Sequence, residues 1–229
     1  MWRLAKNLQY LILRIFGHSW MLYCVLRRFE VFDELLVRET SQLCIDGFPR
    51  SANTFLTLFF SHWNPNAAVA HHVHLPLQVR MAVKYRVPTI VLIRPPLDAI
   101  TSLLIREKFL HLWVALIAYR LFYRQVARYR ESFVLADFAT SITAPEKIIE
   151  EVNIKFKKSF HNGTLTDELK EHLFVMIDGV NTLHSGDETT TSRPSRLRND
   201  QKRQLTTRIK SHRLYAGALR TYLDLGRLR

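Results

Sequence analysis

Short, strongly apolar runs alternate along the chain with longer stretches in which apolar residues recur every three or four positions. The first pattern is typical of buried strands and the second of amphipathic helices. The pattern predicts strands at the start of 42–62 and at 67–72, 88–93 and 132–138. It predicts helices over 2–38, the rest of 42–62, 75–85, 97–108, 109–130, 145–156, 167–175 and 200–224.

Strands that alternate with helices predict the α/β class, as a three-layer sandwich with a central parallel sheet covered on both faces. A length of 229 residues fits a single domain over 1–229. In such folds the site lies beyond the carboxyl ends of the strands. The polar segment 181–199 is long for a loop, and we expect it to be mobile or to form a lid over the site.

The helical segment within residues 1–38 begins like a signal sequence, but two features argue against one. Arg14 and His18 interrupt the apolar run, and no small-residue cleavage site follows. The run is also shorter than the ~20 apolar residues of a membrane-spanning helix. A helix packed on the sheet is the expectation, with a helix lying on a membrane as the alternative.

Charge is unevenly distributed along the chain. The net charge is +13, and the stretch from Arg193 to Arg229 holds eleven Lys or Arg and two Asp, a balance of +9. Such a segment could hold an anionic cofactor or acidic substrate, or contact a membrane or nucleic acid, and composition does not choose among these. The two cysteines, Cys24 and Cys44, form no disulfide framework, so a cytoplasmic protein is expected.

The segment from Cys44 to Phe60 has the strongest chemical signal. An apolar strand ends in a sharp turn at Gly47 and Pro49, and helical spacing follows. This P-loop-like strand-loop-helix presents free backbone N–H groups to an anion. Against the Walker A pattern, however, Ala52 replaces the second glycine and Asn53 the lysine. We therefore expect the loop to hold a phosphate without the lysine and metal of a kinase or ATPase.

Three segments together resemble the PAPS-dependent sulfotransferases. The run Gly47–Leu56 resembles their 5′-phosphosulfate loop, and His72–Leu77 resembles their K-T-H-L-P stretch. The run Ile90–Ser102 resembles their 3′-phosphate segment, R-[ND]-P-x-D-x-x-x-S, with matches at Arg94, Pro96, Asp98 and Ser102. The segments follow one another in the order that the family has.

The resemblance implies a role for each residue of the first loop. Arg50 would bind the phosphosulfate and neutralise charge on the leaving phosphate oxygen, for which a guanidinium fork is suited. Further donors would come from Ser51, Asn53 and Thr54, which would otherwise act as ordinary helix caps. Ala52 stands at a family glycine, so a positive φ there would carry a steric cost. The next residue, Phe55, takes the place of the aromatic residue that stacks on adenine, with a core phenylalanine as the alternative.

The same resemblance makes His74 the general base that deprotonates the acceptor. Arg94 and Ser102 would bind the 3′-phosphate, and Arg193, Arg196 and Arg198 would close over it as a basic loop, with a solvated basic stretch as the alternative for these three. We expect no metal, because the histidines at 71, 72 and 74 lack a convincing ligand geometry. His72 stands at the family's lysine.

The implied function is transfer of a sulfuryl group from PAPS to a hydroxyl or amine by in-line displacement, with PAP as the product. The acceptor would be a small molecule, lipid or glycan, with no nucleic-acid partner and peripheral membrane contact left open. One alternative is an inactive relative that binds PAPS or another nucleotide, which Ala52 and His72 motivate. A second is a peripheral membrane-binding protein that uses its basic C-terminal region.

Overall fold

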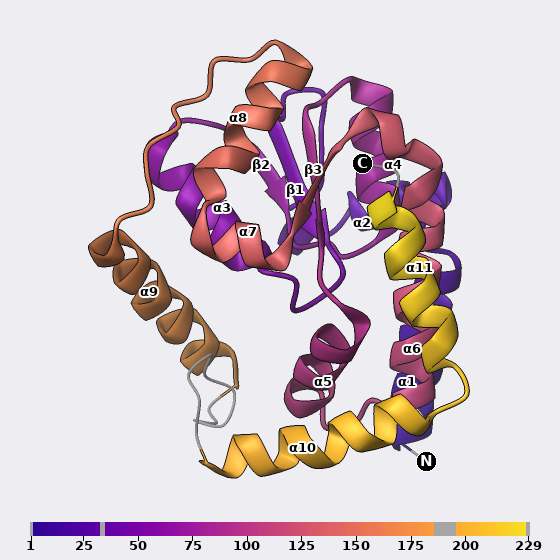
Figure 1. Ribbon diagram of the computed structural model, residues 1–229. Helices are drawn as coiled ribbons and strands as arrows, with labels where there is room; N and C mark the ends of the chain where they lie inside the picture. The colour runs from indigo at the N-terminus through magenta and orange to yellow at the C-terminus, as the bar shows by residue number, and fades with distance from the viewer. Residues whose placement is uncertain (1, 33–34, 186–195, 228–229) are drawn as a thin grey trace.

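The computed structural model describes residues 2–32, 35–185 and 196–227, and within these it leaves out the side chains of 180–201. Four parallel strands form one sheet in the order β2-β1-β3-β4. They are β1 (Leu43–Gly47), β2 (Val69–His71), β3 (Thr89–Ile93) and β4 (Val134–Asp137). Helices cover both faces of this sheet, which confirms the predicted α/β sandwich (Figure 1).

One face of the sheet is covered by α3 (Asn53–Trp63), α7 (Phe138–Thr143), α8 (Pro145–Phe156) and α9 (Asp167–Ser185). On the opposite side, α4 (Pro76–Tyr85), α5 (Pro96–Arg106), α6 (Leu112–Val126) and α11 (Tyr215–Arg227) share one hydrophobic core with the sheet, and α11 lies outside α6. Successive residues of each strand point to opposite faces, so Ile90 and Leu92 pack on the first side while Val91 and Ile93 pack on the second. Prolines stand at the first helical positions of α4, α5 and α8, where no N–H is needed.

The predicted helix over 2–38 is three shorter elements: α1 (Trp2–Ile15), α2 (Trp20–Leu26) and the 3₁₀ turn η1 (Glu30–Phe32). Gly17 separates the first two. A Cβ at this glycine would lie 2.9 Å from the Leu13 carbonyl oxygen and 3.2 Å from the side chains of Leu75 and Pro76. The Leu77 N–H donates to the Gly17 carbonyl at 2.6 Å, which ties this turn to the start of α4.

The C-terminal helices have boundaries that differ from those predicted, and residues 186–195 of the expected mobile loop or lid lie outside the described part. Residues 181–185 continue α9, and α10 (Arg196–Ser211) begins inside the segment 181–199 that was expected to be a loop. The helix expected over 200–224 is divided between α10 and α11, and a turn at 212–214 separates them. Ile209 of α10 and Ala218 and Leu225 of α11 are buried in the core, which explains why α10 lies against α5 and α11 lies against α6 (Figure 1).

Two further elements complete the description. The 3₁₀ segment η2 (Ala127–Ser132) follows α6, and α7 fills what the sequence pattern left unassigned after β4. Within the described residues, no helix combines the length and the apolar character needed to cross a membrane.

Candidate functional site

The loop after β1 turns sharply into α3 through left-handed backbone at two non-glycine residues. The φ angles are 69° at Arg50 and 72° at Ala52. Ala52 is the N-cap of α3, and its methyl group cannot accept a hydrogen bond. The backbone N–H groups of the first turn therefore receive no hydrogen bond from the N-cap side chain. Left-handed residues in such a loop turn backbone N–H groups toward one concavity, and the positive end of the α3 dipole adds to it. The geometry therefore suits an anion.

The polar side chains of this loop lie at different depths. Ser51 and Asn53 are buried, and the Asn53 amide donates to the Phe48 carbonyl at 3.3 Å, which closes the loop on itself. Thr54 is half-buried, and its hydroxyl lies 2.9 Å from Nε2 of His72. Of these three side chains, Thr54 is the one placed at the rim of the loop.

The two arginines expected at opposite ends of the cofactor lie together. Arg94 follows β3, and its Nη1 donates to the Arg50 carbonyl at 2.9 Å. Arg50 in turn donates from Nε to the Ser102 hydroxyl at 3.0 Å. The Arg94 guanidinium carbon lies 3.8 Å from the ring centre of Phe138, and the Tyr119 hydroxyl donates to the Arg94 carbonyl at 2.7 Å. The structure thus brings Arg50, Arg94 and Ser102 into one hydrogen-bonded group.

His74 is held by the end of β1. Its Nδ1 lies 2.8 Å from the Gly47 carbonyl oxygen and 3.2 Å from Oδ1 of Asp46, whose side chain is fully buried. Both carboxylate oxygens of Asp46 also accept from the His74 backbone N–H, at 3.2 and 3.0 Å. Because a carbonyl oxygen can only accept, Nδ1 carries the proton and the neutral ring has its lone pair on Nε2. This is the tautomer that a general base requires.

The N-terminal helix also reaches this histidine. Arg14 of α1 is buried, and its Nη1 donates to the His74 carbonyl. Its guanidinium also lies over the ring of Tyr10, 4.5 Å from the ring centre. The backbone of His74, which has a φ of 56°, is therefore fixed from two sides, by Asp46 and by Arg14.

His72 links His74 to α3. Its Nε2 meets Thr54, its Nδ1 lies 2.7 Å from Nδ1 of His71, and its ring centre lies 5.7 Å from that of His74. Burial, followed by the nearby charges of His74, His71 and Arg106, lowers the pKa of His72 to about 3. His72 is therefore neutral near pH 7 and does not replace the family's lysine as a cation.

Other predicted residues lie elsewhere or outside the described part. Phe55 is 3% exposed and its ring centre lies 5.3 Å from that of Phe174, so the structure places it in the core beneath the loop. Arg193 lies outside the described residues. Arg196 and Arg198 are in the first turn of α10, but their side chains are outside the described part. Cys44 is fully buried, and burial with the neighbouring Asp46 raises the pKa of its thiol, which fits a structural role.

Four residues of the site were missed from the sequence. Asp46 had a local signal, because an acid inside an apolar strand is rarely buried without a partner. Arg14, Tyr119 and Phe138 had none, since each reaches the site from a distant element. The described residues contain no group of three or more His, Cys, Asp or Glu side chains that could hold a metal ion.

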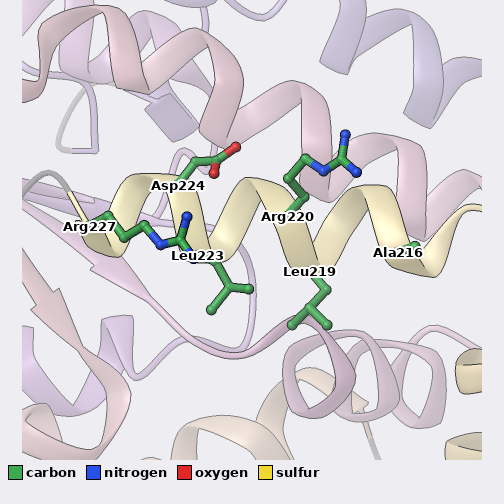
Figure 2. A pocket seen from close by; sticks show the side chains of 6 residues that line it. All are labelled: Ala216, Leu219, Arg220, Leu223, Asp224 and Arg227. Atoms are coloured by element: carbon green, nitrogen blue, oxygen red, sulfur yellow. The ribbon is translucent and has the colours of Figure 1, made fainter.

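A shallow hollow elsewhere on the surface belongs to α11. It has a volume of about 350 Å³ and is lined by Ala216, Leu219, Arg220, Leu223, Asp224 and Arg227. Figure 2 shows Leu219 and Leu223 on the opposite side of the helix from Asp224, and all six lining residues belong to α11. None of these residues belongs to the loops that follow the strands, and we assign no function to this hollow.

Comparison with known proteins gives one structural similarity. No family model matches the sequence, and no curated protein matches it. The structure is similar to the crystal structure of mouse sulfotransferase SULT7A1 complexed with PAP, with 11% identity, a TM-score of 0.45, and coverage of 88% of this chain and 94% of that one.

Proposed function

We propose that this chain binds PAPS and transfers its sulfuryl group to a hydroxyl or amine. The observation that carries the proposal is the position of His74. Its proton is fixed on Nδ1 by the Gly47 carbonyl. Its ring lies beside that of His72, which in turn meets the Thr54 hydroxyl in the first turn of α3. An in-line transfer to a neutral acceptor needs a general base beside the site that binds the anionic donor.

The residues present fit an adenosine bisphosphate with a sulfuryl group. The amides of the loop at 50–54 would hold the 5′-phosphosulfate, with Arg50 beside the oxygen on which negative charge develops. Arg94 and Ser102 would hold the 3′-phosphate. The arrangement places both guanidinium groups at one edge of the sheet, where their joint positive charge stabilises a polyanion.

The bound donor supplies an activated sulfur whose bond to the phosphate oxygen breaks as the acceptor oxygen or nitrogen attacks. In this step Nε2 of His74 accepts the acceptor's proton, and Asp46 stabilises the ring as it becomes positively charged. Arg50 offsets the charge left on the phosphate of the departing PAP. Each of these tasks uses a side chain that the fold already holds in place.

Calorimetric titration with PAP tests the binding half of this proposal. We expect PAP to bind at least about tenfold more tightly than an adenosine 5′-phosphate without the 3′-phosphate. Arg94→Ala should remove most of this preference, whereas Arg128→Ala, at an exposed arginine of η2, should leave it unchanged. Equal affinity for the two nucleotides, or a preference that survives Arg94→Ala, would contradict the assignment.

Turnover of labelled PAPS, with pooled small-alcohol, glycan and lipid acceptors, tests the chemical half. His74→Ala should lower kcat by about 10²–10⁴ with little change in PAP affinity. A second candidate function, nucleotide binding without catalysis, is favoured by the left-handed Ala52 and the neutral His72. PAP binding with equally low turnover in the wild type and in His74→Ala would support that candidate instead.

A further inference from the structure

Helix α1 buries two of its polar residues and exposes a row of apolar residues. Asn7 and Arg14 are 2% and 8% exposed, while Leu4, Leu8 and Ile12 on the other side are 70%, 58% and 44% exposed. The exposed residues recur at intervals of four, so they form one stripe along the helix, which Ile15 continues. A helix that packs a water-soluble core shows the reverse pattern.

Specific hydrogen bonds hold the helix in this orientation. The Asn7 amide donates to the Phe109 carbonyl and its oxygen accepts from the His111 N–H, both at 2.8 Å. In the last turn of the helix, Arg14 donates to the carbonyl of His74. These partners lie 60 residues or more away along the chain, so the apolar stripe is directed outward by the fold itself.

Exposed apolar side chains are concentrated in this part of the protein. Of the seventeen large apolar side chains that are exposed among the described residues, twelve lie between residues 2 and 31. They continue past α1 through Phe16, Trp20 and Met21. Soluble monomers rarely leave so many exposed together, and such a surface marks contact with a partner or a membrane.

The charged residues of this segment are positive up to Arg28, and the first acidic residue is Glu30. Residues 2–29 contain no Asp or Glu, and Arg3, Lys6, Arg27 and Arg28 are exposed. The ammonium group of Lys6 lies 4.2 Å from the centre of the Trp2 ring, and that of Lys84 lies 4.1 Å from the centre of the Trp20 ring. Tryptophan beside a lysine whose stem covers apolar surface is the composition of a membrane interface, where the ring lies at headgroup level and the ammonium meets lipid phosphate.

This charge pattern decides between two occupants of the surface. In a two-fold dimer the same surface faces itself, so the cations of one copy would meet those of the other. An anionic bilayer surface offers the opposite charge and an apolar layer at the depth of the side chains. From these observations we infer that the α1 face, formed by Leu4, Leu8, Ile12, Ile15 and Phe16, docks on an anionic membrane surface with the helix lying in the plane of the interface.

Flotation of the full chain with vesicles tests this inference. Binding should be strong to phosphatidylcholine vesicles that contain phosphatidylserine and much weaker to phosphatidylcholine alone. Leu8→Gln/Ile12→Gln should weaken binding by about tenfold or more, because two apolar side chains no longer enter the bilayer. The matched control is Ile154→Gln/Val175→Gln, at exposed apolar residues of α8 and α9, which should bind as the wild type does.

The electrostatic part has its own pair of variants. Lys6→Glu should reduce the preference for phosphatidylserine by roughly tenfold, whereas Lys155→Glu, at an exposed lysine of α8, should not. Equal urea midpoints for all variants establish that each one is folded.

Three outcomes would overturn the inference. The first is no flotation of the wild type with either vesicle, and the second is an equal loss of binding in the α8/α9 control. The third is a dimer in sedimentation velocity that Leu8→Gln/Ile12→Gln dissociates while vesicles bind neither protein, which would assign the face to contact between copies.

Discussion

Ala52→Gly should stabilise this protein, although glycine usually does the opposite. Ala52 has φ and ψ angles of 72° and 21°, in the left-handed region. A Cβ in that conformation costs roughly 1–2 kcal/mol. Glycine removes this cost but gives the unfolded chain more freedom, which is worth about 0.4–1 kcal/mol in the other direction. Glycine is also a better N-cap than alanine by up to ~1 kcal/mol. We therefore expect a net gain of about 1 kcal/mol in the free energy of unfolding.

Urea unfolding followed by circular dichroism measures this gain as a higher midpoint at an unchanged slope. The matched control is Ala5→Gly, at an exposed residue inside α1, which should lose about 1 kcal/mol because its backbone is helical. The two substitutions are chemically identical, so opposite signs isolate the backbone conformation. If Ala52→Gly loses stability as Ala5→Gly does, the left-handed backbone conformation assigned to Ala52 is wrong.

The same variant bears on the phosphate loop. Ala52→Gly restores the glycine of the sulfotransferase pattern without moving an N–H group, so PAP binding should persist in it. A loss of PAP binding together with a gain in stability would show that the strained turn is required for the anion, and that the loop does not act through its amides as proposed.

Three further predictions concern the histidines and their supports. The pKa of His72 is about 3 in the folded protein and ~6.5 in the unfolded chain, so unfolding takes up a proton at pH values between these two. The free energy of unfolding should therefore fall by about 2 kcal/mol from pH 8 to pH 5. Urea titrations at the two pH values should show this fall, and His72→Gln should remove it. Asp46→Asn should lower turnover about tenfold or more at unchanged PAP affinity, because the charge that supports the His74 imidazolium is lost, and equal turnover would exclude that role. Arg14→Met should cost about 1–3 kcal/mol in urea unfolding by leaving the His74 carbonyl unpaired, whereas Arg3→Met, at an exposed arginine of the same helix, should stay within about 0.5 kcal/mol.

The order of strands and helices was predictable because it depends on local pattern. The apolar run before Arg94 and the strand before Gly47 are each buried on both faces of the sheet, and such strands are readable as continuous apolar segments. The prolines at the starts of α5 and α8 marked the boundaries of those helices. Hence the edge of the sheet where the candidate site residues lie followed from the sequence alone.

The orientation of α1 and the division of the last helix were not predictable in this way. Spacing predicts that α1 is a helix, but apolar periodicity would place Leu8 inward and Arg14 outward. The structure has the reverse because the partners of Asn7 and Arg14 come from the segments around Phe109 and His74. Likewise, the turn between α10 and α11 lets both helices reach the same core. The sequence pattern of residues 200–224 does not predict this turn.

The strongest support for one site comes from backbone conformation, which the motif letters do not contain. Four of the six described non-glycine residues with positive φ are Arg50, Ala52, His72 and His74. Each such residue costs on the order of 1–3 kcal/mol, and it persists where the surrounding structure fixes it. The two loops that contain them are twenty residues apart and share only their position at the carboxyl edge of neighbouring strands. Across that edge, Asp46 holds His74 and Thr54 meets His72, so the strained residues of the two loops contact one group of side chains. A site that uses the two loops together explains why both are strained.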